Sequence, residues 1–170
     1  MIVRGAPLIG VTGAYGLALA TAVDPSDAAI EAAAEHLLAT RPTAVNLRWA
    51  LDRMRAVVLA APLAARAARA RAEAGQIAEE DVAACSAIGD HGAALILEMA
   101  GRINRPLNIL THCNAGWLAT VDWGTALAPI YKAARAGARL HVWVDETRPR
   151  NQGASLTAVS YTHLTLPTKA

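Results

Sequence analysis

The sequence predicts an α/β fold in which a helical amino-terminal portion, residues 1–101, leads into the start of a Rossmann-like parallel sheet, residues 102–158. Two observations support this prediction. Apolar residues recur at helical spacing as far as Gly101. Two short apolar runs with β-branched residues then flank a helical segment, which is the pattern of a β-α-β unit. Because two strands cannot complete such a sheet, we expect the sequence to be truncated before its fold is finished.

The first helix is expected over Leu8–Thr21, after a turn at Arg4-Gly-Ala-Pro7. Proline is tolerated in the first turn of a helix, and small residues allow a close approach of backbones. The uncharged stretch Gly5–Val23 with its Ala-x-Ala patterns is also compatible with a signal peptide. Pro7 and four glycines make a poor membrane core, so a buried helix is the preferred interpretation.

A second helix is predicted over Asp27–Ala39, because its apolar positions follow helical periodicity after the start signal Pro25-Ser26. It should end before Arg41-Pro42, since the residue that precedes a proline is pushed toward extended geometry.

The third helix is expected to be capped by Thr43 or Asn46 and to run past Pro62 with a kink, with an exposed continuation to Glu73. Gly75 should break it. One or two further helices are predicted over Ile77–Met99, with an interruption near Gly89-Asp-His-Gly92.

The β-α-β unit is predicted to contain strands at Leu107–Thr111 and Leu140–Val144, with a helix over Trp123–Ala136 between them that ends at Gly137. Such units form right-handed parallel crossovers. The first strand delivers Cys113 into a loop, Asn114-Ala115-Gly116, that is expected to open a helix.

Cys113 is the main candidate for chemistry, because open α/β sheets place their sites at the carboxyl ends of strands. Backbone N–H groups of the turn and the expected helix would favour a thiolate or bind an anion. The alternative, open on this motif alone, is a small buried hydrophobic residue.

Composition narrows the function classes. Apolar residues make up 54% of the chain and charged residues 18%, with a net charge of +2, so the basic stripe of a nucleic-acid binder is missing. Two cysteines without C-x-x-C spacing offer neither a disulfide framework nor a zinc site, which favours a reducing, cytoplasmic location without a metal. No membrane association is expected.

The last residues, 159–170, share no periodicity with what precedes them. They resemble the translation of a transposase-type sequencing-library adapter, so we expect a non-native tail. Tyr161 and His163 therefore receive no functional weight.

Three blocks of the sequence together resemble the methylthioribose-1-phosphate isomerase family, which is similar in fold to regulatory subunits of the guanine-nucleotide exchange factor of translation initiation. The likeness covers Met1 to Ala158, and Ile88-Gly-Asp-His-Gly92 adds a weaker match. The three blocks are Arg4-Gly-Ala-Pro-Leu-Ile-Gly10, Thr40-Arg-Pro-Thr-Ala-Val-Asn-Leu47, and Ile109-Leu-Thr-His-Cys-Asn-Ala-Gly116 with Asp145-Glu-Thr-Arg-Pro-Arg-Asn-Gln-Gly-Ala154.

The resemblance implies an aldose–ketose isomerase of methionine salvage that converts 5-methylthioribose 1-phosphate to 5-methylthioribulose 1-phosphate with no cofactor, as a cytoplasmic homodimer when full length. It assigns stabilisation of the transition state to Cys113, beside an acid–base aspartate from a later strand-end motif that this sequence does not contain. The residues that match the family's substrate-binding positions are Arg4, Gly5, Ala6, Arg41 and Gln152. A planar guanidinium suits a phosphate.

Without the resemblance, Arg41 is equally compatible with a solvated charge at a helix end, and Gln152 with a loop amide. Asp145 and Glu146 are expected to orient the loop that follows them.

Two alternative functions stay open: isomerisation of ribose 1,5-bisphosphate, and a non-catalytic regulatory relative that binds a sugar phosphate or nucleotide. As a fragment, the chain is expected to be inactive alone.

Overall fold

The computed structural model describes residues 3–113, 115–146, 151 and 153–159. Its contacts divide the chain into two compact units, Met1–Asp81 and Val82–Ala170. The predicted division at 101/102 marks the change from helical to β-α-β structure, whereas the compact units divide inside a helix. Each unit is described by itself below.

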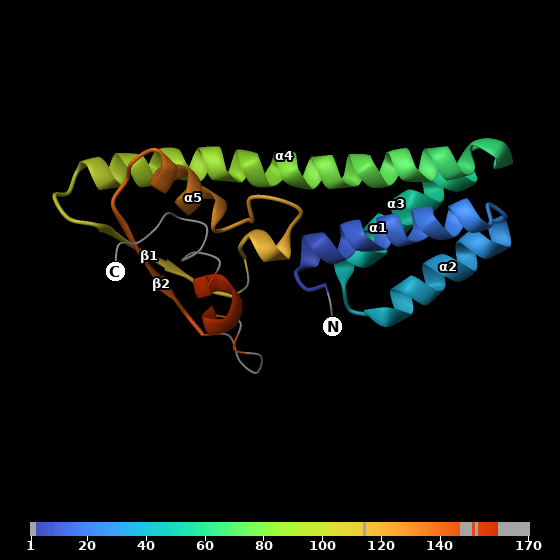
Figure 1. Ribbon diagram of the computed structural model, residues 1–170, viewed down its shortest axis with the longest axis horizontal. Helices are drawn as coiled ribbons and strands as arrows, with labels where there is room; N and C mark the ends of the chain where they lie inside the picture. Colours follow the sequence, from blue (N-terminus) through green and yellow to red (C-terminus); the bar gives the residue numbers. More distant parts are fainter. Residues whose placement is uncertain (1–2, 114, 147–150, 152, 160–170) are drawn as a thin grey trace. The chain divides into compact units, whose positions relative to one another are not determined.

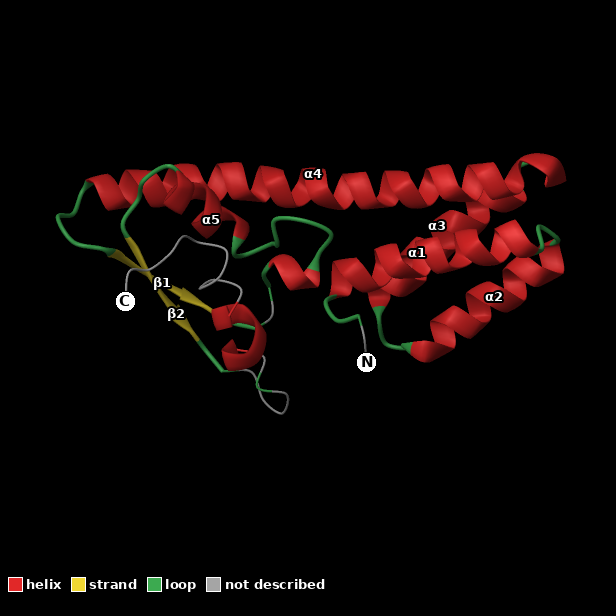
Figure 2. Cartoon of the chain, viewed as in Figure 1, coloured by secondary structure: helices red, strands yellow, loops and turns green. Residues whose placement is uncertain are grey.

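The first unit contains three helices, α1 (Ala6–Val23), α2 (Asp27–Thr40) and α3 (Val45–Leu59), and the first half of α4 (Arg66–Gly101) (Figure 1). A short 3-10 turn, Leu63–Ala65, precedes α4. The second unit contains the rest of α4, the strands β1 (Leu107–Thr111) and β2 (Leu140–Val144), and helix α5 (Ala128–Arg135). In Figure 2 the two strands are yellow and the helices, which make up most of the chain, are red.

Helix α1 begins two residues before its predicted start, because Pro7 occupies its first turn and Gly5 precedes it at a φ of +86°. Its glycines bring it close to α3. A Cβ at Gly10 would lie 2.8 Å from the Asn46 carbonyl oxygen, and one at Gly13 would lie 2.3 Å from Cδ1 of Leu47. Close backbone packing therefore explains the small residues of α1.

Two segments, Ala6–Val23 and Leu63–Gly101, are long and apolar enough to cross a membrane by length and composition. The same test is passed by core helices of soluble proteins. Helix α1 packs in this way, with Ala14 and Leu17 fully buried within the first unit. One face of this stretch is therefore buried, which agrees with the preferred interpretation of a packed helix.

Helix α2 starts as predicted, since the Ala29 N–H donates to Oγ of Ser26 at 3.3 Å. The predicted capping of α3 by Thr43 or Asn46 is wrong. Ala44 is the N-cap, no side chain caps the helix, and the Ala44 carbonyl accepts from Leu47 at 3.1 Å. The start of α3 is thus stabilised by main-chain hydrogen bonds alone.

The expected continuation of α3 past Pro62 is also wrong, because α3 ends at Leu59. The residue before a proline is disfavoured in helical geometry. The side chain of Arg66, which is almost fully buried, holds the connection between α3 and α4 in place. Its guanidinium donates to the carbonyl oxygens of Leu59, Ala61 and Pro25 at 3.2, 3.1 and 2.8 Å, and to the Asp27 carboxylate at 2.5 Å.

A second ion-pair cluster joins α3 to the first half of α4. Arg53 donates from Nε to Glu73 at 2.7 Å and from its two terminal nitrogens to Glu80 at 2.5 and 2.9 Å. The hydrogen bonds from Arg53 lower the pKa of Glu80 below its ordinary value. Glu80 is exposed, so these bonds orient the two helices more than they stabilise them.

Helix α4 is continuous over 36 residues, so the predicted break at Gly75 and the interruption at Gly89–Gly92 are wrong. An interior glycine costs a helix only about 1 kcal/mol. Within the second unit, two of these glycines leave room for α5 to pack closely on α4. A Cβ at Gly92 would lie 2.4 Å from Cγ of Pro129, and one at Gly89 would lie 3.0 Å from Cδ of Lys132.

The two strands pair in parallel, with Leu107 opposite Leu140 and Thr111 opposite Val144, which confirms the predicted β-α-β unit and the α/β class. Helix α5 begins five residues after its predicted start, because Trp123 and Gly124 have φ values of +66° and +82°. A buried cluster of Leu127, Ile130 and Tyr131 packs with Ile96, Ile109, Trp117, Leu140 and Val142.

Candidate active site

The carboxyl ends of β1 and β2 lie next to each other because the strands are parallel and in register. The Asp145 N–H donates to the Thr111 carbonyl at 3.0 Å, which extends the pairing by one residue. Nδ1 of His112 lies 3.7 Å from Oδ2 of Asp145. Ligands of open α/β sheets bind outside this edge, so the residues that follow the two strands form the candidate site.

Cys113 is exposed at this edge, with a φ of +67°. The alternative interpretation of Cys113 as a small buried hydrophobic residue is therefore wrong. That description fits Cys85, which is 2% exposed. A residue with a side chain rarely adopts positive φ, and such strained residues gather at functional sites.

The expectation that the loop after Cys113 opens a helix is wrong, since Trp117–Ala119 forms only a three-residue 3-10 turn. The main chain folds back on itself instead. The backbone N–H and the hydroxyl of Thr125 both donate to the Ala115 carbonyl, at 3.0 and 3.2 Å. Gly124 packs so closely that a Cβ there would lie 2.6 Å from the Gly116 carbonyl carbon. Loop closure, rather than a helix, holds this segment.

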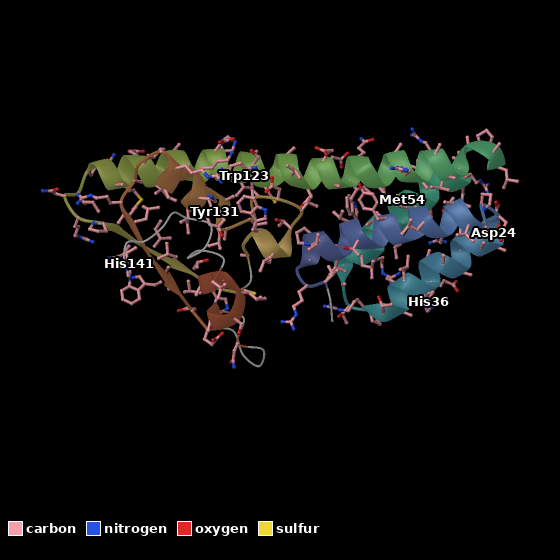
Figure 3. All side chains as sticks on the ribbon, in the orientation of Figure 1. Asp24, His36, Met54, Trp123, Tyr131 and His141 are labelled. Carbon is pink, nitrogen blue, oxygen red and sulfur yellow. The ribbon has the colours of Figure 1, made fainter. Side chains whose placement is uncertain are left out.

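Aromatic and cationic side chains support the loop from α5. Trp117 stacks on Trp123 at 5.9 Å between ring centroids and lies 5.8 Å from Tyr131 (Figure 3 labels Trp123 and Tyr131). Nζ of Lys132 and the guanidinium of Arg135 lie 4.7 and 5.0 Å from the centre of the Trp123 ring. The loop after Cys113 is thus held against a packed helix.

Lys132 is itself fixed by α4 within the second unit. Its Nζ donates to the carbonyl and the hydroxyl oxygen of Ser86, each at 2.8 Å, and to the Asp90 carboxylate at 2.6 Å. The block around Gly89-Asp-His-Gly92 therefore serves the packing of α5.

The segment after β2 returns to Cys113. Glu146 accepts from the backbone N–H groups of Gly153 at 2.9 Å and Ala154 at 3.3 Å. These residues begin a short π-helical turn, Gly153–Thr157, whose last hydroxyl, on Thr157, donates to the Cys113 carbonyl at 2.8 Å. The loop Thr147-Arg148-Pro149, which Asp145 and Glu146 are expected to orient, lies outside the described residues.

The sequence did not single out Thr157, because no local pattern relates it to a cysteine 44 residues away. Gln152, the predicted substrate-binding amide, lies outside the described residues.

The other predicted site residues, Arg4, Gly5, Ala6 and Arg41, belong to the first unit. Arg41 lines a cavity of about 340 Å³ together with Val3, the residue before Arg4. The remaining lining residues are mainly apolar, namely Ile9, Thr12, Gly13, Leu37, Thr40 and Leu47. An arginine at the wall of an apolar cavity suits a ligand with one anionic and one apolar end. Among the described residues, no group of three or more His, Cys, Asp or Glu side chains could hold a metal ion.

A profile of the Initiation factor 2 subunit family matches residues 2–170. The chain belongs to this family. Two solved structures extend the match. The 5-methylthioribose 1-phosphate isomerase of Pyrococcus horikoshii OT3 aligns with 98% of this chain at 40% identity and a TM-score of 0.81. The delta subunit of translation initiation factor eIF-2B from A. fulgidus aligns with 95% of it at 40% identity and a TM-score of 0.80.

Curated relatives named methylthioribose-1-phosphate isomerase are more similar in sequence to this chain than the two solved structures are. The protein of Methylorubrum populi is 70% identical over 158 residues, and that of Paramagnetospirillum magneticum is 66% identical over 158 residues. Each alignment covers 93% of this chain, but only 43% and 44% of the relatives. The chain also spans 47% of each solved structure. It therefore spans less than half the length of these relatives and solved structures.

The contrast between the two cysteines predicts their reactivity. With excess Ellman's reagent, we expect one thiol of the folded chain to react rapidly and the second only after denaturation, because Cys113 is exposed and Cys85 is buried. Peptide mapping of the modified protein should place the fast reaction at Cys113. Fast modification of both thiols in the folded protein would contradict this assignment.

Proposed function

We propose that the protein to which this chain contributes is an isomerase of methionine salvage that converts 5-methylthioribose 1-phosphate to 5-methylthioribulose 1-phosphate. The observation that carries the proposal is an exposed cysteine with strained backbone at the carboxyl end of β1. It occurs in a chain with curated relatives that bear the name of this enzyme, among them one that is 70% identical over 158 residues.

The reaction is an internal rearrangement. A hydrogen leaves C2 of the sugar and arrives at C1, while the bond between C1 and the ring oxygen breaks. The C2 hydroxyl becomes a ketone and its proton passes to the ring oxygen, so that no external oxidant or reductant is consumed. The phosphate blocks the anomeric oxygen, so the ring does not open to a free aldehyde and the site must assist ring opening. The chemistry needs a cationic phosphate clamp and a group that stabilises charge near C1 and C2.

The predicted residues match these needs. We assign phosphate binding to the guanidinium groups of Arg4 and Arg41, with backbone contacts from Gly5 and Ala6 and an amide contact from Gln152. Cys113 stabilises the transition state and works with an aspartate that the resemblance places in a later motif. The proposal includes no cofactor and no metal.

We also propose a Rossmann-like sheet, a cytoplasmic location and a homodimer for the complete protein. Neither nucleic acid nor a membrane is among the proposed partners. The sedimentation coefficient of the complete protein tests the dimer independently of its activity.

A hybrid enzyme tests the activity of this chain directly. The 158 residues of this chain that align with the Methylorubrum populi relative replace their counterparts in that relative. We expect the hybrid to convert 5-methylthioribose 1-phosphate with a kcat near that of the parent relative. A folded hybrid that converts ribose 1,5-bisphosphate instead would identify the alternative isomerase, and one that converts neither sugar would favour the regulatory function suggested by the likeness to the eIF-2B delta subunit.

Substitution of lysine for either arginine in this hybrid tests the phosphate clamp. Arg4→Lys and Arg41→Lys retain the charge but remove the planar pair of donors, so we expect KM to rise about tenfold with a smaller change in kcat. Arg69→Lys, at an exposed position of α4, is the matched control. An unchanged KM for both site variants would rule out their assignment to phosphate binding.

A further inference from the structure

We infer that Thr157 and Glu146 are positioning residues for Cys113, through a chain of contacts that we name the strand-end bridge: Glu146, the Gly153–Thr157 turn and the Cys113 carbonyl. This inference deepens the proposed function and rests on it for the catalytic role of Cys113. The geometric part concerns the thiol alone and is tested without an isomerase assay.

The first step is the backbone of Cys113. With a φ of +67° at a residue that carries a side chain, the peptide would relax toward extended geometry unless the fold held it. The Thr157 hydroxyl restrains this peptide, because it donates to the Cys113 carbonyl at 2.8 Å. Thr157 is itself only 1% exposed. A buried donor keeps such a bond free from competition with water.

The second step is the support of Thr157 itself. Glu146 follows β2 and receives the N–H groups of Gly153 and Ala154, which fixes the start of the turn that ends at Thr157. The contact is tight at Gly153, where a Cβ would lie 2.3 Å from the Asp145 carbonyl oxygen. The turn is therefore anchored at both ends, through Glu146 to the segment that follows β2 and through Thr157 to Cys113, the second residue after β1.

The third step concerns catalysis. The direction of the Cys113 side chain is set by the rotation of its backbone, and that rotation is held at the carbonyl. Small errors in the placement of a reacting group cost about 100-fold in rate. The bridge thus acts on kcat more than on binding.

The test compares Thr157→Val, which keeps the shape but removes the donor, with Thr157→Ser, which restores the hydroxyl. In the hybrid enzyme we expect Thr157→Val to lower kcat about 10- to 100-fold with KM within about twofold, and Thr157→Ser to recover most of the loss. In the 170-residue chain, we expect the pH profile of Cys113 alkylation by iodoacetamide to change for Thr157→Val and not for Thr157→Ser.

Thr21→Val is the matched control. Thr21 is also buried, at 0% exposed, and its hydroxyl donates to the Leu17 carbonyl at 2.8 Å within α1. It therefore loses the same kind of bond, and we expect kcat and the alkylation profile to stay unchanged. Circular dichroism of each variant establishes that it is folded, and a Thr157→Val protein that does not fold is replaced by Glu146→Gln, which weakens the other end of the bridge.

The two readouts separate the inference from the proposed function. If the hybrid is inactive but Thr157→Val changes the alkylation profile of Cys113, the proposed function fails and the positioning of the thiol stands. If Thr157→Val or its Glu146→Gln replacement leaves both kcat and the alkylation profile as in the parent, the inference is overturned.

Discussion

Cys113→Ser in the hybrid enzyme is expected to lower kcat by about 10²–10⁴-fold, because a hydroxyl is a far weaker acid than a thiol and cannot supply the same charge stabilisation. KM should change little, since the proposed phosphate contacts belong to other residues. The exposed position of Cys113 means that its replacement leaves packing intact, and we expect the free energy of unfolding to stay within about 1 kcal/mol of the parent. Steady-state kinetics with 5-methylthioribose 1-phosphate measures the first effect, and urea denaturation the second.

The control for this prediction is Cys85→Ala. Cys85 lies in the second unit but is 2% exposed, so its loss affects packing rather than chemistry. We expect kcat to be retained and stability to fall by about 1 kcal/mol. A Cys113→Ser enzyme with full turnover would remove Cys113 from the mechanism.

Gly124→Ala is expected to have the largest effect on stability, about 2–4 kcal/mol in the free energy of unfolding of the second unit. Two costs combine at this position. The φ of +82° strains any residue with a Cβ, and that Cβ would lie 2.6–2.9 Å from backbone atoms of Gly116 and Trp117. Backbone cannot move aside as the end of a flexible side chain can. Urea denaturation followed by the alkylation of buried Cys85 reports the opening of this unit.

Two other glycines of the second unit separate these costs. Gly137 has a φ of +92° with nothing within 4 Å of an added Cβ, so Gly137→Ala should cost only the backbone strain, about 1 kcal/mol. Gly101→Ala meets neither a contact nor a positive φ, and it should be neutral or stabilising by a few tenths of a kcal/mol. An equal loss for all three variants would contradict the close packing of the loop after Cys113.

The elements predicted well from the sequence are those whose signals are local. Both strands have their predicted bounds, because each is a short apolar run with β-branched residues and polar neighbours. Ser26 predicts the start of α2, because a serine before an apolar-periodic run is a capping signal in itself.

The errors arose where a residue type has two uses that only tertiary contacts distinguish. Gly92 resembles a helix breaker in the sequence, but in the structure it provides room for Pro129 inside a continuous helix. The helix expected at Trp123 begins later because the chain first closes a loop onto Gly116. Main-chain packing of this kind leaves no periodic signal.

The same distinction applies to the candidate site. Cys113 was found from the transition of an apolar run into a glycine-containing turn, which is a feature of adjacent residues. Its partner Thr157 was missed, because a threonine acquires its role only when the fold brings its hydroxyl to a distant carbonyl.

The strand-end bridge also has a consequence for the order of folding. It joins residues 44 positions apart, so it closes only after β1 and β2 have paired across α5. Contacts between residues distant in sequence are slow to form, whereas the hydrogen bonds inside a helix are local. We therefore expect the strained backbone of Cys113 to be among the last features of the second unit to form, so that the cysteine of the nascent chain carries no such strain until the sheet is assembled.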